Sequence, residues 1–256
     1  MIDFTIGLAG HVIGVSACYD STRNFCREYL VSGQPEFSLA VTQADIDYER
    51  RKSERDDVLE DIPARQFSDA YLETLSVYRK IAQWMLGQDT ILFHGSAIGL
   101  DGEAYLFTAK SGTGKSTHTR LWRQTFGDRT VMVNDDKPLL QIKDCGVRVY
   151  GTPWNGKHHL GANMDLPLKA ICILERGTEN QIREISPREA LPMLLQQSYR
   201  PKDRAAMELL LELLGKLIKH VKLYKLQCNM DPQAALISAS AMTGGKINEE
   251  TKKVQQ

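Results

Sequence analysis

Apolar and polar residues follow distinct patterns in the first quarter of the chain. Residues 4–17 are rich in isoleucine, valine and glycine, and residues 36–41 alternate charged, aromatic and aliphatic side chains, which is typical of strands. Residues 49–61 carry dense charge of both signs with few apolar side chains, which favours a solvated connector. We therefore predict a small β-rich lobe with a charged connector over residues 1–66.

A helical pattern follows this connector. Apolar residues recur at spacings of three and four between residues 69 and 86, which predicts an amphipathic helix. Ser68 or Asp69 can cap its first turn, and Gly87 can end it. We expect the helix to lead into a second lobe that spans residues 67–242.

Apolar runs and a glycine-rich loop then follow one another in the order strand, loop, helix, strand. Residues 91–98 and 104–108 are predicted to be strands joined by a tight Asp-Gly turn. Residues 116–126 are predicted to be helical, and residues 130–133 form a short apolar strand. This order indicates an α/β domain. Further predicted elements are strands at 166–174 and 222–228 and helices at 187–197 and 202–219.

Composition and charge exclude several classes of protein. The chain has 256 residues, enough for one large domain or a domain with a smaller companion. Lys and Arg total 32 and Asp and Glu total 32, so no nucleic-acid partner is expected. No apolar run reaches the roughly 18 residues of a membrane helix, so no membrane partner is expected either.

The cysteines and the last residues add two expectations. The five cysteines are scattered and form no C-x-x-C pair, which favours reduced thiols in a cytoplasmic protein over disulfides or a zinc site. Residues 243–256 lack apolar periodicity and are predicted to be a disordered tail.

The segment AKSGTGKS at residues 109–116 has the form [AG]-x-x-x-x-G-K-[ST] of a phosphate-binding loop (P-loop). Its glycines allow consecutive N–H groups to point at phosphate oxygens, and the following helix N-terminus adds partial positive charge. Lys115 is expected to reach the β- and γ-phosphates, and the Ser116 hydroxyl to ligate Mg²⁺. The residues predicted to bind ATP are Ser111, Gly112, Thr113, Gly114, Lys115, Ser116 and Thr117.

An acidic pair closes the next apolar strand. Asp135 and Asp136 follow Asn134, at a place where a carboxylate can hold the metal of a nucleotide. The surplus carboxylate can accept a proton from an attacking hydroxyl, whereas an exposed turn is the alternative for this segment. His94 stands near the end of an earlier strand, where a structural role and a ligand contact are equally open.

The segment GTPWNGKHH combines turn residues with hydrogen-bond donors. Loops of this kind often carry substrate contacts, and its lysine and histidines can steady a transferring phosphate. An arginine after a later strand can neutralise phosphate charge or form a surface ion pair. The substrate contacts predicted here are Trp154, Lys157, His158, His159 and Arg176.

Taken together, these segments carry a resemblance to a known family. His94-Gly95, LFTAKSGTGKST at 106–117 and VNDD at 133–136 resemble the catalytic core of HPr kinase/phosphorylase, over about residues 90–176. The same order is similar to ATP-dependent phosphoenolpyruvate carboxykinase. The long helix and the GTPWNGKHH segment resemble HPr-kinase-related proteins, several of which phosphorylate serine in peptides made by biosynthetic clusters.

The resemblance implies a role for each motif. It implies a P-loop catalytic domain of the HPr kinase/phosphoenolpyruvate carboxykinase type that uses ATP and Mg²⁺. Asp135 would deprotonate the acceptor hydroxyl, Asp136 would attend the metal and His94 would lie near the γ-phosphate. Lys115 and Ser116 would hold the nucleotide and Mg²⁺.

The expected activity is therefore an ATP- and Mg²⁺-dependent transfer of the γ-phosphate to a serine or threonine hydroxyl of a peptide or protein. Thr117 departs from the HPr kinase/phosphorylases, which usually carry Glu there, and matches carboxykinase-like loops. A carboxykinase-like or metabolite kinase is therefore one alternative, and a catalytically weak ATP-binding regulator is another. The sequence is compatible with a homo-oligomer.

Overall fold

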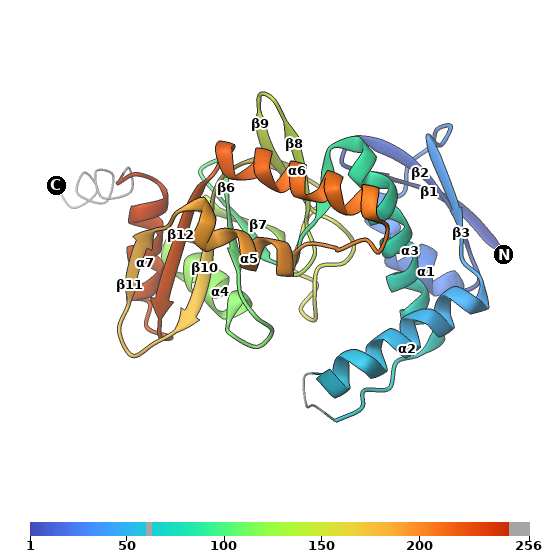
Figure 1. Ribbon diagram of the computed structural model, residues 1–256, viewed down its shortest axis with the longest axis horizontal. Helices are drawn as coiled ribbons and strands as arrows, with labels where there is room; N and C mark the ends of the chain where they lie inside the picture. The colour runs from blue at the N-terminus through green and yellow to red at the C-terminus, as the bar shows by residue number, and fades with distance from the viewer. Residues whose placement is uncertain (60–62, 246–256) are drawn as a thin grey trace. The chain divides into compact units, whose positions relative to one another are not determined.

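The computed structural model describes residues 1–59 and 63–245, and the chain divides into two compact units, Met1–Gly87 and Gln88–Gln256 (Figure 1). We expected a boundary between residues 66 and 67, but the helix that follows belongs to the first unit. Of the predicted tail, residues 246–256 lie outside the described part of the chain. Within that part, no helix is both long and apolar enough to cross a membrane.

In the described residues, the first unit holds a three-stranded sheet in the order β1-β2-β3. β1 (Ile2–Leu8) and β2 (His11–Ala17) form an antiparallel hairpin, and β3 (Phe37–Ala40) runs parallel to β2. The strands predicted in this region are confirmed. The helices of this unit are α1 (Asp20–Phe25), η1 (Arg27–Tyr29), α2 (Gln43–Leu59) and α3 (Asp69–Met85).

The charged connector predicted at residues 49–61 is wrong, because most of that segment belongs to helix α2. Several ion pairs join this helix to α3. Glu49, only 4% exposed, accepts a hydrogen bond from Arg79 of α3, and Arg50 pairs with Asp69. Because charged side chains form this face, the sequence shows no apolar periodicity there, and the hydrophobic pattern did not reveal the helix. With its helices, the first unit is α/β and not β-rich.

Helix α3 agrees with its prediction and anchors the first unit. Ser68 caps it by accepting a hydrogen bond from Tyr71 N (3.3 Å). Glu73 is fully buried, and its carboxylate accepts the backbone N–H groups of Cys18 (2.5 Å) and Tyr19 (3.1 Å). The helix thereby satisfies backbone donors at the beginning of α1.

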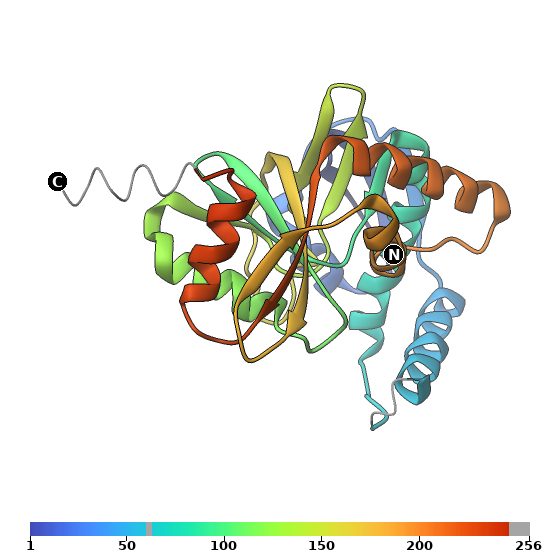
Figure 2. The same ribbon diagram turned by 60° about the vertical axis from the view of Figure 1, so that its left-hand side comes forward.

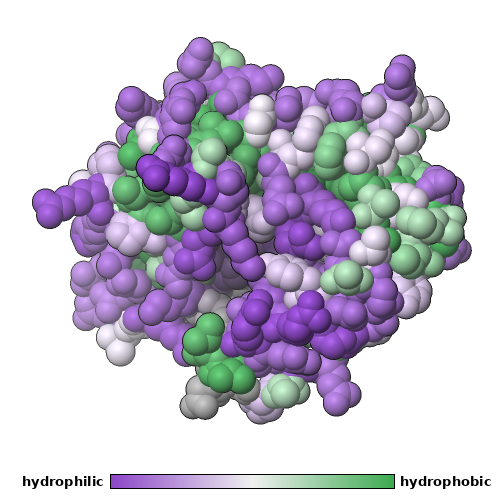
Figure 3. Space-filling model, turned by 45° about the vertical axis from the view of Figure 1, so that its right-hand side comes forward, coloured by the Kyte–Doolittle hydropathy of each residue, from purple (hydrophilic) through white to green (hydrophobic). Residues whose placement is uncertain are grey.

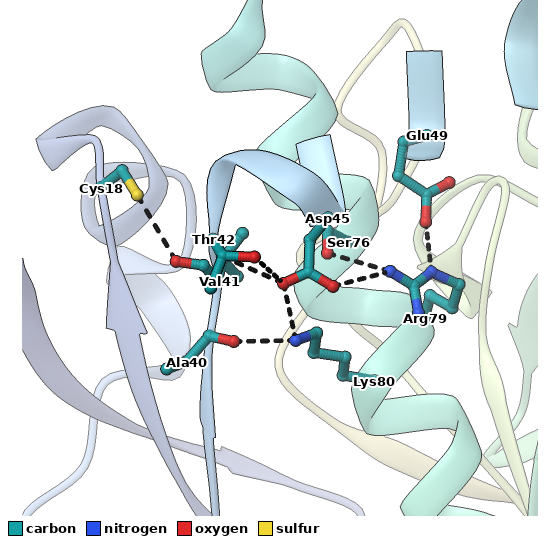
Figure 4. Close-up of polar contacts among 9 residues, drawn as sticks. All are labelled: Cys18, Ala40, Val41, Thr42, Asp45, Glu49, Ser76, Arg79 and Lys80. Atoms are coloured by element: carbon teal, nitrogen blue, oxygen red, sulfur yellow. Dashed lines mark hydrogen bonds and ion pairs between the residues drawn. The ribbon is translucent and has the colours of Figure 1, made fainter. Parts of the chain in front are cut away.

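Asp45 near the beginning of α2 also accepts several hydrogen bonds, some of them from α3 (Figure 4). Its Oδ2 accepts hydrogen bonds from Thr42 N (3.0 Å), Thr42 Oγ1 (2.9 Å) and Lys80 Nζ (2.8 Å). Burial alone would raise the pKa of Asp45, but these donors outweigh it and lower the pKa from 3.8 to about 2.

We expect part of the protein's stability to disappear between about pH 4 and pH 2 through Asp45. Because the pKa is lower in the folded state, this stabilisation is complete above the unfolded value and is lost as the pH falls through the folded one. It amounts to roughly 2 kcal/mol. Urea unfolding of the native protein and Asp45→Asn at pH 5 and pH 2.5 measures it. Equal pH dependence in the two proteins would contradict the assignment.

The second unit is built on a sheet that counts nine strands in the described residues, with β4-β8-β9-β10-β6-β5-β7 as its main path. β12 pairs with β10 and β11. The strands are β4 (Thr90–Leu92), β5 (Ser96–Leu100), β6 (Glu103–Thr108), β7 (Thr130–Asn134), β8 (Leu139–Lys143), β9 (Gly146–Tyr150), β10 (Asp165–Arg176), β11 (Gln181–Glu184) and β12 (Lys222–Cys228). The short helix η2 (Leu86–Gln88) spans the boundary between the units. The helices of the second unit are α4 (Lys115–Phe126), η3 (Gly127–Arg129), α5 (Pro187–Gln197), α6 (Arg204–His220) and α7 (Gln233–Met242).

Most predicted elements of this unit are confirmed to within a few residues, and one is divided. The strand predicted at 91–98 is interrupted after Leu92, because the next backbone groups bond elsewhere: His94 N donates to Gln197 O (2.7 Å), and Gly95 N to Asp136 O (3.0 Å). The hairpin β8–β9, strand β11 and helix α7 were not predicted.

The direction of the strands gathers several loops at one edge of this sheet. β10 runs parallel to β6 and β12, and β5 runs antiparallel to both β6 and β7. β6 and β7 are therefore parallel to each other, and their carboxyl ends meet at the edge where β5 begins and β10 ends. The glycine-rich loop, the acidic pair and Arg176 all follow or end strands at this edge.

Helices cover both faces of the sheet. Figure 2 shows α4 and α7 on one side and α6 on the other. The core under α4 and α7 includes the fully buried Trp122, which packs at 5.2 Å against Phe107 of β6. This packing fixes the helix that begins at the glycine-rich loop.

The outer surface is mainly polar where Figure 3 displays it. Hydrophilic side chains dominate that face, and hydrophobic side chains gather in a few patches on it.

Candidate nucleotide-binding and phosphate-transfer site

The glycine-rich loop lies between β6 and α4, in the strand–loop–helix context that the sequence predicts. Gly112 and Gly114 have φ angles of 72° and 122°, which residues with a Cβ rarely adopt. Gly114 precedes the first helical residue, and its carbonyl accepts a hydrogen bond from His118 N (2.9 Å). The N-terminus of α4, with its partial positive charge, is therefore directed at the loop.

Lys115 is buried beneath the loop, with 8% of its surface exposed. Its Nζ donates to Ala109 O at 3.2 Å. Burial lowers the pKa of Lys115, while the charges of Asp136 and Asp135 act in the opposite direction. The ammonium group therefore lies within electrostatic range of both acids.

Asp135 is 5% exposed and accepts a hydrogen bond from Ser96 Oγ at 2.5 Å. Ser96 Oγ is in turn 3.0 Å from Thr119 Oγ1 of α4. Burial raises the pKa of Asp135, although hydrogen bonds from Ser96 and Ser116 oppose the shift. The carboxyl group therefore lies beside the Ser116 hydroxyl in a poorly solvated place.

Asp136 has a different environment from its neighbour. Its carboxylate is 3.3 Å from His94 Nε2 and 3.0 Å from Lys137 Nζ. Burial alone would raise the pKa of Asp136, but the hydrogen bond from His94 and the charge of Lys137 hold it well below the ordinary value. The two adjacent acids thus differ: one is held ionised, and the other favours its protonated form more than usual.

Asn134 organises the turn that presents these acids, and sequence reasoning gave it no role. It is fully buried, and its Oδ1 accepts Asp136 N (2.9 Å) and Lys137 N (2.8 Å). Its Nδ2 donates to Thr152 O (3.1 Å) and Oγ1 (3.0 Å). An Asn that begins a turn before two acids is the signal that could have found it.

The GTPWNGKHH segment lies against the same turn. Lys137 N donates to Trp154 O (3.1 Å), and a Cβ at Gly156 would come within 3.3 Å of Asp136 Cβ. Trp154 is only 4% exposed. His158 is near enough for its charge to lower the pKa of Asp135. The predicted residues Lys157, His158 and His159 are all exposed.

Arg176 at the end of β10 also reaches the site. Its Nη2 donates to Gly112 O at 2.5 Å, so the guanidinium group lies on the glycine-rich loop. The structure thus brings this distant residue to the loop. Of the other predicted loop residues, Ser111 and Ser116 are exposed, and Thr113 and Thr117 are partly exposed.

Comparisons with known proteins show a distant likeness among solved structures. No family model matches the chain, and no curated protein matches it. Among solved structures, the chain is similar to the HPr(Ser) kinase/phosphatase from Coxiella burnetii, with 10% sequence identity and a TM-score of 0.34. The match covers 64% of this chain and 95% of that chain. Apart from this likeness, the structure shows an α/β protein in which a lysine, an acidic pair and an arginine lie at a glycine-rich loop.

Proposed function

We propose that this protein is an ATP- and Mg²⁺-dependent kinase that transfers the γ-phosphate to a serine or threonine hydroxyl of a peptide or protein. The observation that supports this most is the meeting, at one sheet edge, of the glycine-rich loop with the buried Asp135 carboxyl. Phosphate transfer needs a cradle for the nucleotide and a group that accepts the proton of the hydroxyl. The glycine-rich loop and Asp135, which would fill these two roles, lie at the same edge.

The loop and two cations are the proposed nucleotide site. The backbone amides before α4 would bind phosphate oxygens, helped by the partial charge of the helix N-terminus. Lys115, now bonded to Ala109 O, would turn to the β- and γ-phosphates. Arg176 lies on Gly112 and would neutralise charge on the transferring group.

Asp135 is the proposed base. Its raised pKa brings the carboxyl group nearer to neutral pH, where a base works best, and Ser96 fixes its orientation at 2.5 Å. His94, held against Asp136, would lie near the γ-phosphate. These groups would position the hydroxyl and accept its proton.

Ser116 and Asp136 are the residues that would hold Mg²⁺. A hydroxyl and an ionised carboxylate are the oxygen donors that this cation prefers, and it commonly takes one or two carboxylates with phosphates and water. Among the described residues, no group of three or more His, Cys, Asp or Glu side chains could hold a metal. When bound, Mg²⁺ supplies charge neutralisation at the phosphates.

Lys115→Met tests the proposal. We expect it to lower transfer from γ-labelled ATP into clarified lysate by roughly 10²–10³-fold, because the variant lacks the cation that stabilises the phosphates. The label is fractionated by size, and Lys143→Met, at an exposed lysine ending β8, is the control that retains activity.

Three results would overturn the proposal. Label on small molecules alone would indicate a metabolite or carboxykinase-like enzyme. ATP binding without transfer would indicate a regulator. Full transfer by Lys115→Met would show that the nucleotide does not bind at this loop.

A further inference from the structure

Two buried hydroxyl groups join the helix that follows the glycine-rich loop to the carboxyl group of Asp135. Ser96 of β5 is fully buried, and Thr119 of α4 is 2% exposed. Ser96 Oγ donates to Asp135 Oδ1 at 2.5 Å and lies 3.0 Å from Thr119 Oγ1. The carboxyl group, the serine and the threonine therefore form a chain of polar groups that is largely excluded from solvent.

The direction of each hydrogen bond in this chain follows from the number of protons. A hydroxyl group has one proton to donate and two lone pairs that accept. Because Ser96 gives its proton to Asp135, it can only accept from Thr119. Thr119 has two other acceptors within its own helix, Lys115 O at 3.4 Å and Ser116 O at 3.3 Å. Ser96 Oγ is nearer than either carbonyl and is therefore the favoured acceptor.

Asp135 accepts hydrogen bonds from two hydroxyl groups that are held differently. Ser116 is exposed at the beginning of α4, whereas Ser96 is fully buried in β5, which pairs with both β6 and β7. Ser96 is therefore the more firmly placed of the two. Hydrogen bonds in a chain polarise one another, so donation from Thr119 strengthens the bond from Ser96 to the carboxyl group.

We propose that Thr119 is a positioning residue that acts on Asp135 through Ser96. This inference rests on the proposed function, in which Asp135 accepts the proton of the acceptor hydroxyl. Thr119 lies about one turn after Lys115, on the helix that begins at the glycine-rich loop. The helix that would bind the phosphates therefore also orients the base, and one hydrogen-bonded unit holds both.

Thr119→Val keeps the branched shape of the side chain and removes the hydroxyl group. Ser96 then lacks its donor, so its own hydroxyl group is free to turn away from Asp135. Misplacing a reacting group by about 1 Å can lower a rate by roughly 10²-fold. Because Thr119 acts indirectly, we expect a smaller loss, about tenfold in the rate of transfer, with ATP affinity unchanged to within about twofold.

The experiment measures single-turnover transfer from γ-labelled ATP into the peptide and protein fraction of clarified lysate. Equilibrium binding gives the ATP affinity separately. Thr119→Ser keeps the hydroxyl group and should transfer at nearly the native rate. Thr125→Val, which makes the same change near the other end of α4, is the matched control. Circular dichroism checks each fold, and Thr119→Ala takes the place of Thr119→Val if that variant does not fold.

A double-mutant cycle shows whether Thr119 acts through Ser96. Ser96→Ala breaks the chain at its centre, and we expect it to lower the rate by about 10–100-fold. Adding Thr119→Val to Ser96→Ala should lower the rate no further, because the threonine then has no serine to orient. A merely structural role of Thr119 would instead give losses that multiply.

Three results would overturn this inference while leaving the proposed function in place. They are a native rate for the variant without the Thr119 hydroxyl, losses that multiply in the double variant, and ATP binding that weakens as much as the rate. Absence of transfer by the native protein would instead overturn the proposed function, and this inference with it.

Discussion

Asp135→Asn is expected to lower phosphate transfer by about 10²–10⁴-fold while ATP binding stays nearly unchanged. The amide cannot accept the proton of the attacking hydroxyl, although it keeps the size of the carboxyl group. It can still accept the hydrogen bond from Ser96, so the turn should keep its shape. The loss should therefore fall on the rate of transfer.

The measurement is single-turnover transfer from γ-labelled ATP, with nucleotide affinity determined separately by equilibrium binding. Asp144→Asn is the matched control, because Asp144 is an exposed acid in the turn between β8 and β9. It should keep full activity. If Asp135→Asn transfers phosphate at the native rate, Asp135 is not the base.

Gly151→Ala is expected to destabilise the second unit by about 3 kcal/mol. An added Cβ would lie 1.9 Å from Ala162 O and 2.7 Å from Val133 O. Both obstacles are backbone carbonyls, and Val133 O already accepts a hydrogen bond from Ala162 N (3.2 Å). The backbone would therefore have to move, because no flexible side chain can turn aside.

Gly215→Ala provides the opposite case on the same unit. Gly215 lies within α6, and a Cβ there would meet nothing within 4 Å. The substitution should stabilise the protein by roughly 0.5–1 kcal/mol, since alanine is the better helix former. Urea unfolding of the two variants measures both effects. Similar midpoints for the two would mean that the GTPWNGKHH segment does not pack against β7 as the structure has it.

The surroundings of Asp135 and Asp136 show what sequence alone could not determine about the site. The acids were found because they end an apolar strand, yet their different environments come from distant groups. Ser96 of β5 orients Asp135, and His94 holds Asp136 ionised. Arg176 is 64 residues from the glycine of the loop that it contacts. Such contacts depend on strand order, which no local pattern encodes.

In the fold, too, local patterns predict some features and tertiary contacts decide others. Local patterns determined the strand–loop–helix unit around Lys115 and the amphipathic helix α3, because glycine, capping residues and apolar periodicity act within a few residues. Tertiary structure alone decided that the charged segment of α2 is helical, because the partners of its ion pairs, such as Arg79 for Glu49, lie on another helix. It also decided that Asp135 and Asp136 differ, because burial and charge partners, not sequence position, determine the pKa of a carboxyl group.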